Sequence, residues 1–160
     1  MVGLGEKLTC MQCGKEYRLT EYGKMEALSG ETEIAHIPDW YKWQRQCVRE
    51  ELEGGRYAMN LPVEIMVMID SYTLYHIGEG RLTHGEDGFR LVSADGKLDY
   101  HQAPTASYTV NSDFYWYQIS DVVCVGDMSA QYYCLPKNSG DVVAKVRLAA
   151  EELYKMKTKK

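Results

Sequence analysis

Two cysteines near the start of the chain have a spacing that suits a metal ion. Cys10 and Cys13 are separated by two residues, so both sulfurs can reach one metal, and Gly14 frees the backbone to turn toward it. A redox pair with this spacing normally opens a helix, whose dipole lowers the pKa of the thiol. Here a strand-like pattern follows instead, so we interpret Cys10 and Cys13 as two ligands of a zinc site.

A structural zinc site needs four ligands, and the sequence offers only these two. Cys47, Cys124 and Cys134 stand alone in amphipathic or apolar stretches, where cysteine is usually a small hydrophobic residue. None of the four histidines has a partner at metal-ligand spacing. We therefore expect an incomplete zinc site in this chain. The missing ligands lie upstream in a longer protein, or a second copy shares the metal, or the hairpin folds without one.

No recognisable catalytic set occurs in the sequence. It contains no phosphate-binding loop, no dinucleotide-binding glycine pattern and no nucleophile elbow. His84, Glu86 and Asp87 are close together and could do acid–base work. They also flank a glycine-containing hairpin turn, where polar residues are common, and we favour the turn. Two glycines at 77–81 likewise indicate a turn or a bulge.

An aromatic run, "FYWYQI", occupies residues 114–119 and could stack against a ligand. Strands also favour aromatic residues, and strand alternation would place Phe114 and Trp116 on one face and Tyr115 and Tyr117 on the other. The pattern favours one core-facing side and one decorated surface.

Three segments are expected to position these side chains. Residues 1–37 show three short strand patterns and form a zinc-ribbon-like hairpin. Residues 38–55 form a linking amphipathic helix, which begins at Pro38 and Asp39 and ends at two glycines. Its tryptophans dock the helix on another element or sit at a membrane interface, and their helical spacing favours docking.

Residues 56–160 read as many short strands followed by one helix. Eight strand candidates, including 106–110 and 114–119, are separated by turn signals such as the Asp-Gly pairs. The final helix is capped by Asp141 and has apolar residues that would cover the sheet. We therefore predict an α+β, mainly β fold: a pleckstrin-homology-like antiparallel barrel or sandwich closed by a C-terminal helix.

Charge is distributed unevenly along the 160 residues, whose net charge is −5. Residues 61–140 hold four Lys/Arg against ten Asp/Glu, and residues 141–160 hold six against three. Such an acidic body is unsuited to non-specific nucleic-acid binding, which needs many phosphate contacts. The basic tail could touch an acidic membrane surface, but a solvated helix end is the simpler interpretation.

The longest apolar run, at 65–69, is far shorter than the ~20 residues that span a bilayer. The first residues lack the basic start and apolar core of a signal peptide. We therefore expect a cytoplasmic chain with reduced cysteines, which could lie at the inner face of the membrane.

Several stretches together resemble a known family. The order "GKEYRLTEYGKMEAL", "HIPDWYKWQRQCVREELEGGRY", "GEGRLTHGEDGFRL", "LDYHQAPTASYTV", "FYWYQISDVVCVGD" and "VVAKVRLAAEELYK" covers nearly the whole chain. It resembles the region after the catalytic domain in long bacterial, clostridial-type 1-acyl-sn-glycerol-3-phosphate acyltransferases. The stretch from His36 to Arg45 is the most specific part of the resemblance.

The resemblance implies an acyltransferase domain and a further cysteine knuckle upstream, which would supply the two missing zinc ligands. It also implies a catalytic His followed five positions later by Asp. None of the four histidines here has an Asp at that position. The expected role is thus a non-catalytic accessory or regulatory module of a phospholipid-biosynthesis acyltransferase.

Two expectations about partners follow. The main one is contact with the upstream acyltransferase domain or another protein, since the barrel has too few basic residues to grip anionic lipid headgroups. The alternative is a stand-alone protein-binding module that dimerises through its N-terminal hairpin and shares zinc.

Overall fold

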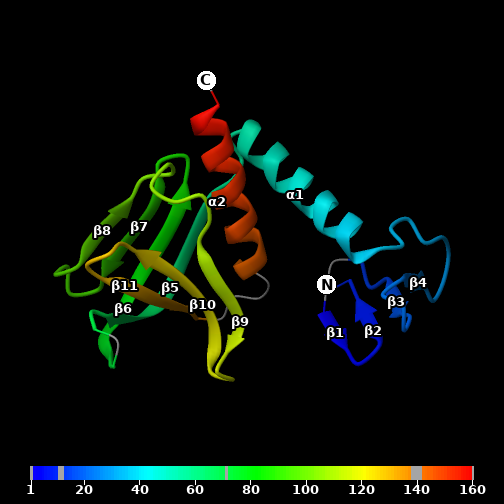
Figure 1. Cartoon of the computed structure of the whole chain (residues 1–160), viewed down its shortest axis with the longest axis horizontal. Helices are drawn as coiled ribbons and strands as arrows, with labels where there is room; N and C mark the ends of the chain where they lie inside the picture. The colour runs from blue at the N-terminus through cyan, green and yellow to red at the C-terminus, as the bar shows by residue number, and fades with distance from the viewer. Residues whose placement is uncertain (1, 11–12, 71, 138–141, 160) are drawn as a thin grey trace. The chain divides into compact units, whose positions relative to one another are not determined.

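The computed structural model describes residues 2–10, 13–70, 72–137 and 142–159, which form two antiparallel sheets and two helices (Figure 1). The expected mainly β fold with two helices is thereby confirmed. By its internal contacts the chain divides into two compact units, Met1–Cys47 and Val48–Lys160. Among the described residues, no helix has both the length and the apolar character needed to cross a membrane.

The first unit contains a four-stranded sheet, of which the sequence predicted three strands. The strands follow the chain order: β1 (Val2–Leu4), β2 (Lys7–Thr9), β3 (Glu16–Leu19) and β4 (Met25–Ala27). The additional strand, β1, is a three-residue strand that pairs with β2 and is too short to show alternation. Tyr17 and Met25 are the buried hydrophobic residues among those described in this unit.

Helix α1 (Ile37–Glu53) begins one residue before the expected start and ends at the expected glycines. Gly55 has a φ of 62°, and the N–H of Arg56 donates to the carbonyl of Glu51 at 2.8 Å, which ends the helix in a left-handed turn. In its first half, the ring of Trp40 packs edge-on against Tyr17, with centroids 6.1 Å apart. The expected docking of this tryptophan on another element is therefore confirmed.

The second unit contains a seven-stranded sheet in which every neighbouring pair is antiparallel. Its order is β8-β7-β6-β5-β11-β10-β9. The expected strand at 106–110 is wrong, because that segment is irregular and leads into β9. The strands are β5 (Met59–Met68), β6 (Leu74–Gly85), β7 (Gly88–Ser93), β8 (Asp99–Gln102), β9 (Asn111–Trp116), β10 (Ser120–Gly126) and β11 (Gln131–Pro136).

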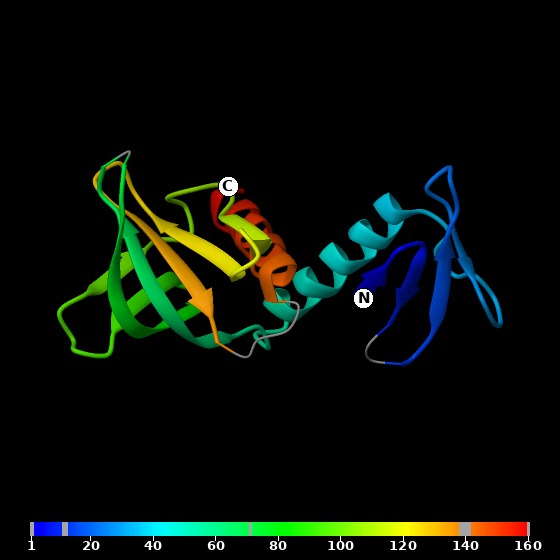
Figure 2. The same ribbon diagram turned by 90° about the horizontal axis from the view of Figure 1, so that it is seen from below.

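The core of this unit lies between the sheet and the last helix, α2 (Val142–Thr158), which contacts β9 and β10 (Figure 2). Val48 and Leu52 of α1 also belong to this core. Expected helix residues such as Val146 and Leu153 are indeed buried against it. Asp141, the expected cap, lies outside the described residues.

Strand pairing leaves the larger sheet open, but side chains join β8 to the strands near its other end. Oε1 of Gln102 in β8 accepts a hydrogen bond from the N–H of Gly126 in β10, at 3.1 Å. The rings of Tyr100 and Tyr132 also meet, with centroids 5.2 Å apart. The glycines at 77–81 lie inside β6, and the expected bulge occurs as a register shift opposite Ile65.

Candidate functional site

The turn between β2 and β3 carries Cys10 and Cys13. The N–H of Cys10 donates to the carbonyl of Lys15, and the N–H of Gly14 donates to the carbonyl of Cys10, both at 2.8 Å. Gly14 has a φ of 72°, a left-handed conformation that glycine adopts without steric cost. The sharp turn expected after the cysteine pair is therefore present, and Cys13 is exposed at it.

Lys15 fixes the other side of this turn. Its ammonium group donates to Oε1 of Glu33 at 2.6 Å and to the carbonyl of Glu31 at 2.6 Å. The hydrogen bond with Glu33 raises the pKa of Lys15 and lowers that of Glu33. A cation therefore lies beside the cysteine turn, held by the loop that follows β4.

These residues fit half of a structural zinc site. Two thiolates separated by two residues at a tight turn suit a tetrahedral ion, which needs two more ligands. No cluster of three or more His, Cys, Asp or Glu side chains suitable for a metal is found in the part of the chain that the structure describes. The two cysteines would hold the ion together with groups from elsewhere, and its contribution would be to crosslink the hairpin.

The structure does not bring His84, Glu86 and Asp87 together as a catalytic group. His84 is buried at the end of β6, where its ring stacks on Phe89 with centroids 3.8 Å apart. Its Nδ1 shares a hydrogen bond with the hydroxyl of Tyr57 at 2.9 Å. Burial lowers the pKa of His84 to about 4 and raises that of Tyr57 above its usual range. His84 is thus a neutral core residue at pH 7, while Glu86 and Asp87 lie in the β6–β7 turn.

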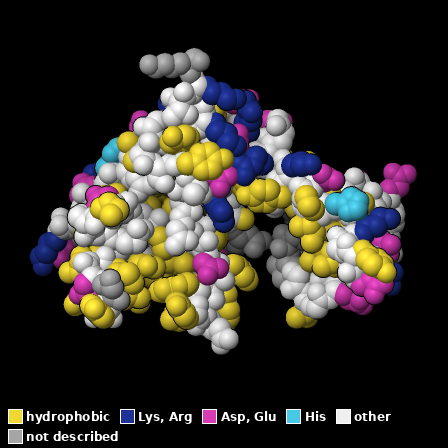
Figure 3. Space-filling model, in the orientation of Figure 1, with side chains coloured by type: hydrophobic (Ala, Val, Ile, Leu, Met, Phe, Trp, Pro, Cys, Tyr) yellow, Lys and Arg dark blue, Asp and Glu magenta, His cyan; other side chains and the backbone are white. Residues whose placement is uncertain are grey.

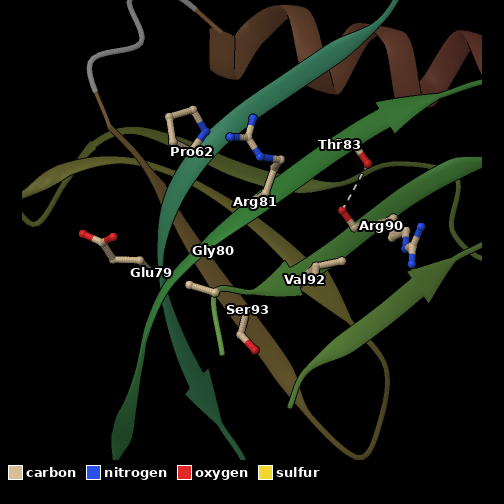
Figure 4. A pocket seen from close by; sticks show the side chains of 9 residues that line it. Pro62, Glu79, Gly80, Arg81, Thr83, Arg90, Val92 and Ser93 are labelled. Atoms are coloured by element: carbon tan, nitrogen blue, oxygen red, sulfur yellow. Dashed lines mark hydrogen bonds between the residues drawn. The ribbon is translucent and has the colours of Figure 1, made fainter. Parts of the chain in front are cut away.

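A hollow of about 590 Å³ lies on β5, β6 and β7 (Figure 4). Its charged side chains are already occupied: Arg90 forms two hydrogen bonds with Asp99 at 2.9 and 2.8 Å, and Arg81 donates to Asn60 at 2.7 Å. In Figure 4 the Arg81 guanidinium lies beside Pro62, and the Arg90 guanidinium points away from it. The charges do not converge on one point, so the hollow has no group arranged for catalysis. Its lining residues are Pro62, Glu79, Gly80, Arg81, Thr83, Arg90, Val92, Ser93 and Ala94.

The aromatic run at 114–119 is the most unusual part of the surface, and its expected alternation is wrong. Tyr115, Tyr117 and Gln118 have φ values of 54°, 47° and 60°, so the strand pattern stops at Trp116. The N–H of Ile119 donates to the carbonyl of Trp116 at 2.9 Å and closes the turn between β9 and β10. We call residues 114–119 the aromatic turn.

One ring of the aromatic turn is anchored and the others are exposed. Trp116 stacks on Tyr133 of β11, with centroids 5.2 Å apart, while the hydroxyl of Tyr133 reaches the sulfur of Met68 at 3.9 Å. Phe114 is 71% exposed and Tyr117 is 80% exposed. Figure 3 shows hydrophobic side chains gathered over the lower part of the larger unit. The aromatic turn therefore exposes apolar side chains on both sides of an anchored Trp116 ring.

The surroundings of the aromatic turn are acidic. Two aspartates, Asp113 and Asp121, flank it in the sequence. Asp113 is exposed beside Phe114, and Asp121 accepts a hydrogen bond from the N–H of Tyr115 at 3.1 Å. Aromatic side chains with unneutralised carboxylates beside them form a surface suited to binding a cationic, partly apolar partner.

Comparison with known proteins does not add a relative: no protein-family model matches the chain, and a search of curated proteins gives no significant match. Functional inference therefore depends on the residues themselves. The sequence identified the cysteine turn and the aromatic run, but not the left-handed conformation that exposes the aromatic side chains. It gave no signal for the Tyr57–His84 contact either, because Tyr57 lies in the loop before β5 and His84 lies in β6.

Proposed function

We propose that this chain is a non-catalytic accessory module that works through protein contact. In this proposal it belongs to a phospholipid-biosynthesis acyltransferase of the long bacterial 1-acyl-sn-glycerol-3-phosphate acyltransferase type. It positions or regulates the catalytic domain at the membrane. The residues from His36 to Arg45 carry the resemblance to that family.

The observation that carries the protein-contact role is the acidic, aromatic surface of the larger unit. Exposed apolar side chains that project from a monomer surface typically mark an interaction site. The aromatic turn exposes Phe114, Tyr115, Tyr117 and Ile119. Because Asp113 and Asp121 flank the aromatic turn and pair with no lysine or arginine in the described part of the chain, this surface is poorly suited to anionic headgroups and better suited to a protein.

The arrangement of the larger unit supports a pleckstrin-homology-like domain as its finer classification. Seven antiparallel strands are followed by one helix, and the first strand of the unit, β5, pairs with the last, β11. Helix α2 then covers the inner side of the sheet. Domains of this architecture commonly serve as binding platforms, and this is an argument by analogy of fold alone.

A zinc-ribbon-like role for the first unit is part of the same proposal. Cys10 and Cys13 would supply two ligands, and a further cysteine knuckle in the preceding acyltransferase region would supply the others. The turn geometry at Gly14 supports this assignment.

Immunoprecipitation from the source cells tests the proposed function. An antibody to this chain is expected to precipitate a protein much heavier than 18.3 kDa, together with transfer of acyl groups from acyl-CoA to 1-acyl-sn-glycerol-3-phosphate. A precipitated protein of 18.3 kDa without that activity would contradict the proposal. A dimer with one zinc ion per two chains would then favour the stand-alone module.

A further inference from the structure

We propose that the aromatic turn docks a protein segment in which lysine or arginine side chains alternate with apolar ones. The apolar side chains of the segment would pack on Phe114, Tyr117 and Ile119, and its cations would meet the aspartates beside them. This inference rests on the proposed protein-contact role and specifies the surface and the chemistry of the partner.

The backbone of the aromatic turn is the first argument. Tyr117 and Gln118 both have positive φ at the centre of the turn, which is the requirement of a type I′ turn and normally selects Asn-Gly. Tyr115 adds a third left-handed residue, held by Asp121. Bulky residues rarely adopt this conformation, and such strain concentrates at functional sites. The exposed Tyr117 ring gains no burial that would offset the strain within this chain.

The presentation of the side chains is the second argument. Phe114, Tyr117 and Ile119 are 71%, 80% and 62% exposed. Between them, Trp116 stacks on Tyr133 and also meets Tyr117 at a centroid distance of 4.9 Å. The anchored Trp116 ring restricts the neighbouring Tyr117 ring before a partner binds, which lowers the conformational entropy lost on binding.

The charge of the surface is the third argument and decides the chemistry of the partner. Among the described residues, Asp113 and Asp121 form no ion pair with a lysine or arginine. Asp121 accepts a hydrogen bond from the backbone N–H of Tyr115, which is neutral and leaves the negative charge in place. These charges favour a cation, and exposed tyrosine and phenylalanine rings add cation–π attraction.

Charge also argues against two other occupants. An anionic bilayer surface has the same sign as the aspartates and would repel them. A second copy docked face to face would bring the two sets of aspartates together. A protein segment with lysine or arginine side chains has the opposite charge and would not be repelled by the aspartates.

Tryptophan fluorescence of the full chain tests this proposal. In a Trp40→Phe, Trp43→Phe background, Trp116 is the one remaining tryptophan and reports on the aromatic turn. The probes are two synthetic peptides of about twelve residues, one alternating lysine with leucine and the other alternating glutamate with leucine. We expect saturable binding of the lysine peptide at low salt, weakened about tenfold at high salt. The glutamate peptide should bind at least about tenfold more weakly.

Matched variants assign the binding to the aromatic turn. Tyr117→Ser and Phe114→Ser should each weaken lysine-peptide binding about tenfold. Tyr72→Ser removes a 95% exposed tyrosine from the β5–β6 hairpin and should leave binding unchanged. Equal binding of the two peptides, or equal loss in all three variants, would overturn the inference.

Vesicles separate the membrane from the protein. Binding to neutral phosphatidylcholine vesicles that depends on Tyr117, without binding of the lysine peptide, would overturn the inference in favour of a lipid surface. The immunoprecipitation result is independent of both probes. If acyltransferase activity precipitates but the lysine peptide does not bind, this inference alone fails; in the reverse case, the acyltransferase assignment alone fails.

Discussion

The two compact units of this chain differ greatly in how much they bury. In Met1–Cys47, the described residues include two buried hydrophobic side chains, Tyr17 and Met25. In Val48–Lys160, buried side chains from both helices and most strands form one continuous core. Since burial of apolar area is the main stabilising contribution to folding, the core contributes more to the stability of the larger unit than to that of the smaller one.

This difference would give a zinc ion held by the cysteine pair a stabilising role. Domains of fewer than about 40 residues usually need disulfides, a metal or oligomerisation to be stable, and Met1–Cys47 is close to that size. Cys10 and Cys13 lie at a tight turn in the unit with the small core, whereas Cys124 and Cys134 are buried in the other. Burial raises the pKa of Cys124 to about 12, so it remains a protonated thiol. The thiols suited to crosslinking thus lie where crosslinking would help.

The largest expected effect is in the larger core. Leu82 in β6 is fully buried, and Leu82→Ala should lower the free energy of unfolding by about 4 kcal/mol, because it leaves a cavity. Urea denaturation gives the size of the loss, and hydrogen exchange should show reduced protection in Val48–Lys160. Ile77→Ala, in the partly exposed part of the same strand, is the control and should cost less than about 1 kcal/mol.

A somewhat smaller effect is expected in the first unit. Met25→Ala should cost about 3 kcal/mol and lower hydrogen-exchange protection in Met1–Cys47 alone. Leu28→Ala, at an exposed position after β4, should leave that protection nearly unchanged. If Met25→Ala reduced protection equally in Val48–Lys160, the two units would not differ in stability as their cores suggest.

Acid should destabilise the larger unit through His84. The pKa of its imidazole is about 4 when folded and 6.5 ordinarily, so between these values the unfolded chain takes up a proton that the folded chain does not. The contribution of His84 to the free energy of unfolding is therefore fully present above about pH 6.5 and decreases toward pH 4. At pH 5 the free energy of unfolding is lower by about 2 kcal/mol. Comparing urea denaturation at pH 7 and pH 5 measures this loss.

A variant at the buried site tests the cause of the acid effect. His84→Leu should abolish most of the difference between pH 7 and pH 5, whereas His101→Gln, at an exposed position in β8, should keep it. An unchanged pH dependence in His84→Leu would mean that other groups cause it.

The smallest expected effect has the opposite sign. Tyr117→Asn with Gln118→Gly gives the aromatic turn the residues that its positive φ values favour, and should stabilise the chain by about 1 kcal/mol. The same change should weaken binding of the lysine peptide, since it removes an exposed ring. Thermal denaturation and fluorescence titration measure the two effects. Loss of both stability and binding would show that the turn serves folding and not recognition.

Most of the architecture could be predicted because it depends on local signals. The hairpin between β6 and β7 was predicted from its glycine, and Gly88 indeed has a φ of 93°. The helix end at Gly55 was predicted for the same reason. Residues 106–110 alternate like a strand, but no neighbouring strand pairs with them, and a strand requires such a partner.

The candidate sites were less predictable because they depend on non-local contacts. His84 follows the pattern of a polar residue near a turn, and only its meeting with Tyr57 and Phe89 makes it a core residue. The left-handed tyrosines of the aromatic turn contradict local propensity, so the strand expected at 114–119 ends at Trp116. Cys10 and Cys13 were identified from spacing, which is a local property.

The pairing of β5 with β11 has a consequence for how fast the chain folds. In the larger sheet, every other neighbouring pair of strands is consecutive in sequence, while this pair joins Val63 to Pro136. Closing that long loop costs chain entropy before the contacts between β5 and β11 can form, so we expect this step to limit the folding rate. Ile65→Val in β5 should then slow refolding, whereas Leu91→Ala in β7 should mainly accelerate unfolding. Stopped-flow kinetics that reversed this order would place the rate-limiting step in a local hairpin instead.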